Sequence, residues 1–355
     1  MNKDFIFNHV LGGLAGAIIG DAMGSATETL TLDDIYSRFG GRVTDFYSPG
    51  EGTFASGRKA GQITDDTSQM LKIIHAIIEN NGNISVELVA NELLEWAKQD
   101  ELFSRFAGPT TKKAIELLRA GHDPYKTGIA EKMGMGISNG AAMKVAPAGW
   151  LNPGDLDRAV EDAVVLCIPT HNADMAFAGA GAVAAAIAES LNPESNILTV
   201  LDAALYGAKK GYEIGKKQSI VLRSPSMVSR ISLAAEIAVT HADFYTACER
   251  LAEVIGCGLP LLEAVPFAIG VFIASRGDPN LAILGSVNMG GDADTTSTIT
   301  GAITGSFAGI TKFNQETYHK VVEVNNFDLE KIAKELTETA LKKEISIPSD
   351  LRNNL

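Results

Sequence analysis

Apolar residues recur along most of the chain at intervals of three and four positions, which is the spacing of one face of an α-helix. Met70, Ile73, Ile74, Ile77 and Ile78 share such a face, and an Asn-Asn-Gly sequence ends the pattern. The same periodicity predicts helices over residues 84–98, 110–120, 155–167, 173–190, 197–216, 229–239, 243–256, 261–275, 293–309 and 328–343.

Strand patterns are scarce. The best, GRVTDFYSP at residues 41–49, is short, and we interpret it as a loop extension. Glycine- and proline-rich stretches predict long loops over residues 48–62, 121–140 and 275–292. Because no linker, low-complexity tract or repeat interrupts the chain, we expect one compact all-α domain spanning residues 1–355.

Glycine occurs at every fourth position in two places. Gly12, Gly16, Gly20 and Gly24 form one series, and residues 301, 305 and 309 form another. A glycine inside a helix costs about 1 kcal/mol relative to alanine. On a helix each series would leave a flat groove, so we expect close packing of another backbone, or a ligand, to offset that cost.

Composition and charge narrow the class of protein. Apolar residues make up 46% of the 355 residues and charged residues 21%, which is typical of a globular chain. The net charge of −13 argues against binding to nucleic acid or to an anionic membrane. The apolar run near the N-terminus stops at Asp21, short of a membrane span. Three cysteines without a C-x-x-C pair favour buried thiols in a reducing compartment, so we expect a cytoplasmic protein.

Two acidic clusters stand at predicted helix starts. Thr64, Asp65, Asp66 and Thr67 precede the helix that contains Met70. One carboxylate is explained by helix capping, which satisfies free N–H groups and complements the helix dipole. A second adjacent carboxylate is surplus to that role.

The second cluster has the same layout. Asp292 and Asp294 flank Ala293 and are followed by Thr295, directly after two glycines. If the two helix starts face each other, carboxylate and hydroxyl oxygens converge in numbers that suit two hard divalent cations such as Mg²⁺, with Mn²⁺ as a possible substitute. Capping alone remains the alternative for each cluster taken singly.

Two further polar stretches lack a clear structural purpose. Glu28 ends a glycine-rich segment, GDAMGSATE, and is either a solvated loop residue or part of a site. The loop GMGISNGAAMK at residues 134–144 can present N–H groups to a phosphate. His171 precedes a predicted helix and either donates to an anion or caps a turn.

Taken in order, these motifs resemble the ADP-ribosylglycohydrolase family. The resemblance is carried by GGLAGAIIGDAMGSATE, GQITDDTSQM, SNGAAMKVAPAG, THNADMAFAGAGAVAAAIA, EAVPFAIGVF and NMGGDADTTSTITGAITGS, which run from residue 12 to residue 306. It implies an orthogonal all-α fold with a central cleft that holds two Mg²⁺ ions. The metal ligands it implies are Thr64, Asp65, Asp66, Asp292, Asp294 and Thr295.

The resemblance also implies roles at the sugar. Glu28 would lie near the reacting ribose, with Glu28 or Asp292 as candidate catalytic residues. The ribose and diphosphate of ADP-ribose would be held by Gly136, Ser138, Asn139, Gly140, Met143 and His171. The family pattern is not matched at Lys144, where arginine is common, nor at Ala26, where proline is common.

The implied reaction is hydrolysis of the bond at the anomeric carbon of a ribose. The favoured substrate is an ADP-ribosylated protein side chain, arginine above others. Two alternatives are a small N-riboside or nucleoside-type metabolite, and a non-catalytic binding or structural role, which is known in the family. The sequence leaves open the general base, the oligomeric state and the role of residues 310–355.

Overall fold

The computed structural model describes residues 2–129, 136–221 and 223–345. Within these ranges the protein is built from helices, and no residue belongs to a β-strand. The first half contains α1 (Lys3–Gly24), α2 (Leu32–Phe39), α3 (Asp65–Glu79), α4 (Val86–Trp96), α5 (Asp100–Phe106), α6 (Pro109–Arg119), α7 (Pro124–Thr127), the 3-10 helix η1 (Asn139–Ala141), α8 (Ala146–Leu151) and α9 (Leu156–Cys167). The second half contains α10 (Asp174–Ser190), α11 (Ile197–Gln218), α12 (Met227–Thr240), α13 (Phe244–Val254), α14 (Leu261–Ala274), α15 (Pro279–Val287), α16 (Ala293–Ala308), η2 (Ile310–Lys312), α17 (Gln315–Asn325) and α18 (Leu329–Ile345).

The all-α prediction is confirmed, and every helix predicted from periodicity is present within a few residues of its expected ends. Residues 41–49 form no strand. The expected loop over residues 275–292 is wrong in its middle, where α15 lies. Pro279 is typical of a loop, yet here it occupies the first turn of α15, directly after the capping residue Asp278. At this position the missing N–H of proline costs no hydrogen bond.

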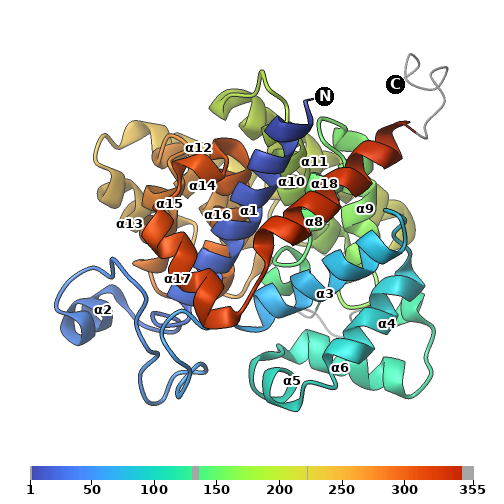
Figure 1. Ribbon diagram of the computed structural model, residues 1–355, viewed down its shortest axis with the longest axis horizontal. Coiled ribbons are helices and arrows are strands. Elements are labelled where there is room, and N and C mark those ends of the chain that lie inside the picture. The colour runs from blue at the N-terminus through green and yellow to red at the C-terminus, as the bar shows by residue number, and fades with distance from the viewer. Residues whose placement is uncertain (1, 130–135, 222, 346–355) are drawn as a thin grey trace.

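The two glycine series pack against each other. A Cβ atom added to Gly12, Gly16 or Gly20 would collide with the backbone of α16, and one added to Gly301 would collide with the carbonyl of Gly16. In Figure 1, α1 in dark blue therefore runs through the middle of the molecule in contact with α16. The glycines permit a backbone-to-backbone approach that fixes the end of α1 relative to the start of α16.

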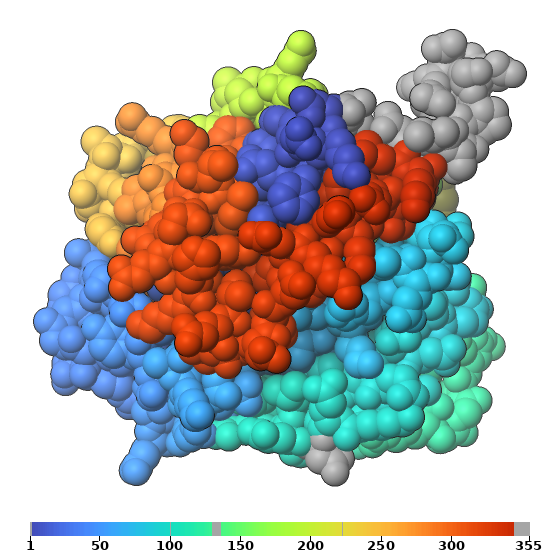
Figure 2. Space-filling model, viewed as in Figure 1, coloured from blue at the N-terminus to red at the C-terminus, as the bar shows by residue number. Residues whose placement is uncertain are grey.

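Among the helices that the structure describes, α1 alone is long and apolar enough to cross a membrane by length and composition, but 78% of the relevant window is buried inside the protein. Its neighbours include α16, α18, α15 and α3. Figure 2 shows the C-terminal segment in red lying across this face, with only the N-terminal turns of α1 visible at the top. The burial identifies α1 as the central core helix of the fold.

Candidate active site

The C-terminal half of α1 positions the first acidic cluster. Asp21 is fully buried, and its carboxylate accepts hydrogen bonds from the backbone N–H groups of Thr64 and Thr67 at 3.0–3.1 Å. It also accepts one from Thr64 Oγ1 at 2.7 Å. These bonds satisfy the free N–H groups at the start of α3 from another helix. The carboxylates of Asp65 and Asp66 are therefore not needed to cap α3.

The same end of α1 positions the second cluster. A Cβ atom at Gly24 would collide with Ala293, the first residue of α16. Beyond Gly24 the chain pairs with the loop before α16, since Thr29 N–H donates to Gly291 O at 2.7 Å and Gly291 N–H donates to Leu30 O at 3.3 Å. Gly291 has a φ of +66°, which favours glycine. Residue 28 is thereby held next to the start of α16.

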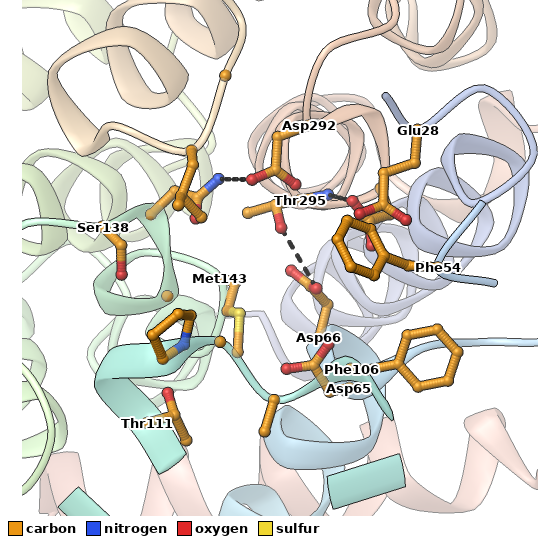
Figure 3. Close-up of a pocket in the computed structure, with 18 of the residues that line it drawn as sticks. Glu28, Phe54, Asp65, Asp66, Phe106, Thr111, Ser138, Met143, Asp292 and Thr295 are labelled. Atoms are coloured by element: carbon orange, nitrogen blue, oxygen red, sulfur yellow. Dashed lines mark hydrogen bonds between the residues drawn. The ribbon is translucent and has the colours of Figure 1, made fainter. Parts of the chain in front are cut away.

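The two acidic clusters, more than two hundred residues apart in the sequence, meet in the structure. Thr295 Oγ1 donates to Asp66 Oδ2 at 3.3 Å. On the other side, oxygens of Glu28, Asp292 and Asp294 lie within 4.8 Å of one another. Figure 3 shows Asp65 and Asp66 facing Asp292, Thr295 and Glu28 across one space. The structure therefore brings the two acidic clusters together, as the two-ion hypothesis requires.

The electrostatics of this cluster are unfavourable without a cation. Burial, and next the charge of Asp292, raise the pKa of Glu28 to about 8. Burial and the neighbouring Asp21 raise the pKa of Asp65 to about 8. Burial also raises the pKa values of Asp66 and Asp294 well above the ordinary aspartate value. Burial therefore favours the protonated forms of these carboxyl groups, and a bound cation would favour their charged forms.

A divalent metal fits the donor set. The buried oxygens Glu28 Oε2 and Asp66 Oδ1 have no hydrogen-bond partner among the described residues. Oxygen-only ligands with unpartnered carboxylates are the donors that Mg²⁺ and Mn²⁺ prefer. Thr64 differs from the other expected ligands, because its hydroxyl already donates to Asp21 and it does not line the cavity. Its role as a ligand stays a prediction.

The acidic cluster borders a cavity of about 550 Å³. That volume is in the range of small-molecule sites. The lining comes from the turn after α1, the loop that carries Phe54, the starts of α3, α6 and α16, the C-terminal end of α5, and the segments around residues 138–143 and 258–259. Its residues are Glu28, Thr29, Phe54, Asp65, Asp66, Arg105, Phe106, Ala107, Gly108, Pro109, Thr111, Lys112, Ser138, Asn139, Gly140, Met143, Gly258, Leu259, Gly291, Asp292, Asp294 and Thr295.

The glycine-rich loop forms one wall of the cavity. Ser138, Asn139, Gly140 and Met143 line it, and the Asn139 side-chain amide donates to Asp292 Oδ2 at 2.9 Å. Gly136 is buried and is not among the lining residues. Residues 134 and 135 of the motif lie outside the described residues. The loop therefore joins the acidic cluster directly, through Asn139.

His171 lies behind this wall. Its Nε2 is 2.8 Å from Ser138 Oγ and its Nδ1 is 2.8 Å from Thr170 Oγ1. Burial lowers its pKa well below the ordinary histidine value, so the ring is neutral at pH 7. The side chain is fully buried and does not line the cavity. His171 thus orients Ser138, and any effect on a ligand passes through that hydroxyl.

Lys144, the departure from the family pattern, is fully buried. Its ammonium group donates to the carbonyl oxygen of Gly140, within the same loop. Burial lowers the pKa of Lys144, while the negative charges of Asp65 and Asp66 act in the opposite direction. The Lys144 side chain thus holds the loop through Gly140 and places a buried cationic group near Asp65 and Asp66.

Three features of the site escaped the sequence analysis. Asp21 is part of the quoted motif, but its pairing with the start of α3 depends on how two helices cross. Gln69 donates to Asp65 Oδ2 at 2.8 Å, although the sequence indicated no role for it beyond its place in a quoted motif. Phe54 and Phe106 come from segments that carried no motif. The i, i+4 spacing of Asp65 and Gln69 is the one local signal that was available.

Comparison with known proteins shows the family to which the chain belongs. The family model described as ADP-ribosylglycohydrolase matches residues 2–345. The chain belongs to the ADP-ribosylglycohydrolase family. The predicted resemblance is therefore confirmed, and the protein is a member of a family of glycohydrolases.

Several relatives are similar over most of their length. An uncharacterized protein of Escherichia coli, YegU, is 31% identical over 337 residues, covering 94% of this chain and 98% of its own. The human ADP-ribosylhydrolase ARH3 is 28% identical over 316 residues, covering 84% and 85%. The ADP-ribosylarginine hydrolase Tri1 of Pseudomonas putida is 25% identical over 340 residues, covering 93% and 78%.

A solved structure confirms the fold. A chain of an ADP-ribosylglycohydrolase-related protein complex superposes with a TM-score of 0.66 and 21% sequence identity, covering 95% of this chain and 99% of that one.

Proposed function

We propose that this glycohydrolase is Mg²⁺-dependent and cleaves the glycosidic bond at the anomeric carbon of a ribose. The observation that carries the proposal is the meeting of two acidic clusters at one cavity, with buried carboxylate oxygens on Glu28 and Asp66 that lack partners among the described residues. The proposed ligands are Asp65, Asp66, Asp292, Asp294 and Thr295, with Thr64 as the least supported and Mn²⁺ as a substitute ion.

The chain's own residues supply the remaining chemistry. When bound, the two ions would fix sugar hydroxyls and activate a water. Glu28 Oε2 has no hydrogen-bond partner among the described residues and would accept the proton of that water. A base is most effective when its pKa is near the working pH. The wall formed by Ser138, Asn139 and Gly140 would hold the ribose and any phosphate. The bond from the sugar carbon to the leaving group breaks, a bond to the water oxygen forms, and the leaving group takes a proton.

ADP-ribose attached to a protein side chain is the substrate class favoured by the relatives. Their names include an ADP-ribosylhydrolase, an ADP-ribosylarginine hydrolase and an ADP-ribosyl-[dinitrogen reductase] glycohydrolase. Modified arginine is the first substrate to test. A small N-riboside is the second candidate, because aromatic residues line the cavity beside Glu28. Three free cysteines support a cytoplasmic location.

Replacement of one ligand tests the metal. We predict that Asp292→Ala abolishes turnover and removes the thermal stabilisation by Mg²⁺. A ligand at 100 times its Kd stabilises the native state by about 2.7 kcal/mol, which calorimetry detects easily. Asp202→Ala, an exposed aspartate on α11, is the matched control and should keep both properties.

Substrates are then compared with the wild-type protein. Hydrolysis of ADP-ribosyl-arginine, ADP-ribosyl-serine, O-acetyl-ADP-ribose and common nucleosides is measured with and without Mg²⁺. Unchanged Mg²⁺-dependent turnover in the Asp292→Ala variant would refute the metal site. Absence of hydrolysis of every riboside would favour the non-catalytic alternative.

A further inference from the structure

An exposed aromatic side chain borders the cavity next to the acidic cluster. Phe54 is 59% exposed and packs into none of the apolar clusters formed by the described residues. It nevertheless lines the cavity together with Glu28 and Asp65. A phenyl ring at a cavity edge with no packing role in the core is available to contact a ligand.

An arginine holds the backbone of the loop that carries Phe54. Arg105 Nε donates to the carbonyl oxygen of Phe54, and the same guanidinium donates to the carbonyl oxygen of Ser56. The loop that carries Phe54 is thereby attached to α5. Because this loop has no regular secondary structure, the hydrogen bonds from Arg105 are what hold it at the cavity.

A second aromatic residue is held by the same cation. Phe106 lines the cavity, and the guanidinium carbon of Arg105 lies 5.5 Å from the centroid of its ring. The guanidinium carbon of Arg58 lies 5.3 Å from that centroid. Such cation–π contacts restrain the ring. Arg105 therefore couples the two aromatic residues of the cavity rim.

The aromatic pair lies on the side of the acidic cluster that is opposite the glycine-rich wall. In Figure 3, Phe54 lies beside Glu28, Phe106 lies to the right of Asp65, and Ser138 is on the far left. If the wall at Ser138 holds the sugar and any phosphate, then the group departing from the anomeric carbon faces Phe54 and Phe106.

Two cationic side chains lie among the cavity-lining residues near the aromatic pair. Arg105 and Lys112 line the cavity, while Arg58 is paired with Glu101 at 3.5 Å. Lys112 donates to the carbonyl oxygen of Ser104, which does not neutralise its charge. A guanidinium leaving group would meet like charges at the rim, and a neutral aromatic ring would not.

We propose that Phe54 and Phe106 form a subsite for a planar, uncharged aromatic leaving group, so that the preferred substrate is a riboside of the nucleoside type and not modified arginine. The inference rests on the proposed glycosidase reaction and selects its second substrate class. Hydrolysis then releases the aromatic group with one proton and leaves the water oxygen on the sugar carbon. Phe54 is the specificity-determining residue, because its ring is the more exposed of the two.

Binding of two transition-state mimics tests the subsite. Iminoribitol and a phenyl-substituted iminoribitol are titrated calorimetrically into the Mg²⁺-containing protein. We expect the wild type to bind the phenyl compound at least tenfold more tightly than the plain one. In Phe54→Ala that preference should fall to less than about threefold, because an aromatic contact of this kind is worth roughly a factor of ten. Affinity for plain iminoribitol should stay unchanged.

Two variants control for other effects. Phe54→Leu keeps apolar bulk without the aromatic ring and should retain only part of the preference. Tyr47→Ala removes a 37% exposed aromatic residue that packs against Phe39 outside the cavity, and this variant should retain the full preference. Equal wild-type binding of the two mimics, or an unchanged preference in Phe54→Ala, overturns the subsite.

Substrate turnover separates this inference from the proposed function. The wild type should hydrolyse purine or pyrimidine ribosides with a higher kcat/KM than ADP-ribosyl-arginine. A preference for ADP-ribosyl-arginine overturns the subsite but is consistent with the proposed glycosidase reaction. Phe54 would then contact a protein substrate. Failure to hydrolyse any riboside in Mg²⁺ rejects the glycosidase, and the subsite with it.

Discussion

Buried carboxyl groups dominate the site at the scale of single residues. Glu28, Asp65, Asp66 and Asp294 all have raised pKa values, chiefly because burial penalises the charged form. Within the part of the chain that the structure describes, Lys144 is the one fully buried cation near them. Such a cluster is costly in the metal-free protein, and a bound cation would offset that cost.

The raised pKa of Glu28 has a consequence for stability. In the unfolded chain this carboxyl loses its proton near pH 4.5, whereas in the folded protein its pKa is about 8. Between these values the native state binds more protons, so the stability of the metal-free protein falls as pH rises. We predict a lower Tm at pH 8.5 than at pH 6 in EDTA, and a smaller decrease in Glu28→Gln.

Calorimetry across this pH range, with Glu330→Gln as an exposed control, checks the prediction. Mg²⁺ should raise the Tm more at pH 8 than at pH 6, because protons compete with the ion for the same oxygens. A metal-free Tm that rises between pH 6 and pH 8.5 would contradict the raised pKa.

Asp21 acts differently, as a positioning residue that orders other groups. Its carboxylate accepts bonds from the Thr64 and Thr67 N–H groups and from the Thr64 hydroxyl. Leaving such buried donors unpaired costs about 1–3 kcal/mol each. We predict that Asp21→Ala lowers the free energy of unfolding by several kcal/mol and weakens stabilisation by Mg²⁺ at least tenfold in apparent affinity.

The control for Asp21 removes a helix cap elsewhere. Thr31 caps α2 through an exposed side chain, so Thr31→Ala should cost about 1 kcal/mol and leave the response to Mg²⁺ intact. Denaturant unfolding with and without Mg²⁺ measures both effects. If both variants respond to Mg²⁺ alike, Asp21 has only a structural role.

At the scale of elements, the contact between α1 and α16 determines where the acidic groups lie. The glycines of the two helices allow backbone contact, and a Cβ at Gly16 would strike the carbonyl of Gly301. Because Gly24 packs on the first residue of α16, a shift of one helix along the other would separate Glu28 from Asp292 and Asp294.

We predict that Gly16→Ala destabilises the protein by about 1–3 kcal/mol or more, since the two backbones must move apart. Gly108→Ala is the control for the change of residue type, because a Cβ there would meet nothing within 4 Å and φ at this position is −64°. Chemical denaturation measures both variants. Equal stability of Gly16→Ala and the wild type would show that the contact is looser than described.

At the scale of the whole molecule, the main apolar cluster joins residues from Ile6 to Ala340. The C-terminal segment, whose role the sequence leaves open, contributes to it: Leu329, Ala333 and Leu336 of α18 are buried. Helix α18 is amphipathic, and its apolar side packs on α1 and α3.

We predict that Leu336→Ala lowers stability by about 2–5 kcal/mol, the usual cost of emptying a buried leucine site. Its kcat/KM at a temperature where the protein stays folded should equal that of the wild type, because Leu336 does not line the cavity. Thermal unfolding and initial rates measured on the same sample separate the two effects. A loss of activity without a loss of stability would show that α18 influences the site.

Local patterns in the sequence determined the helices, the two glycine grooves and the acidic helix starts, because helix periodicity, capping and small-residue spacing are properties of neighbouring residues. They missed α15, where a proline that starts a helix resembles one that ends it. Only the tertiary structure decided which groove packs on which, that Asp21 caps α3, that His171 stands behind Ser138, and that Phe54 faces the acidic cluster. These are contacts between distant segments, and their energies depend on how helices cross and what becomes buried between them.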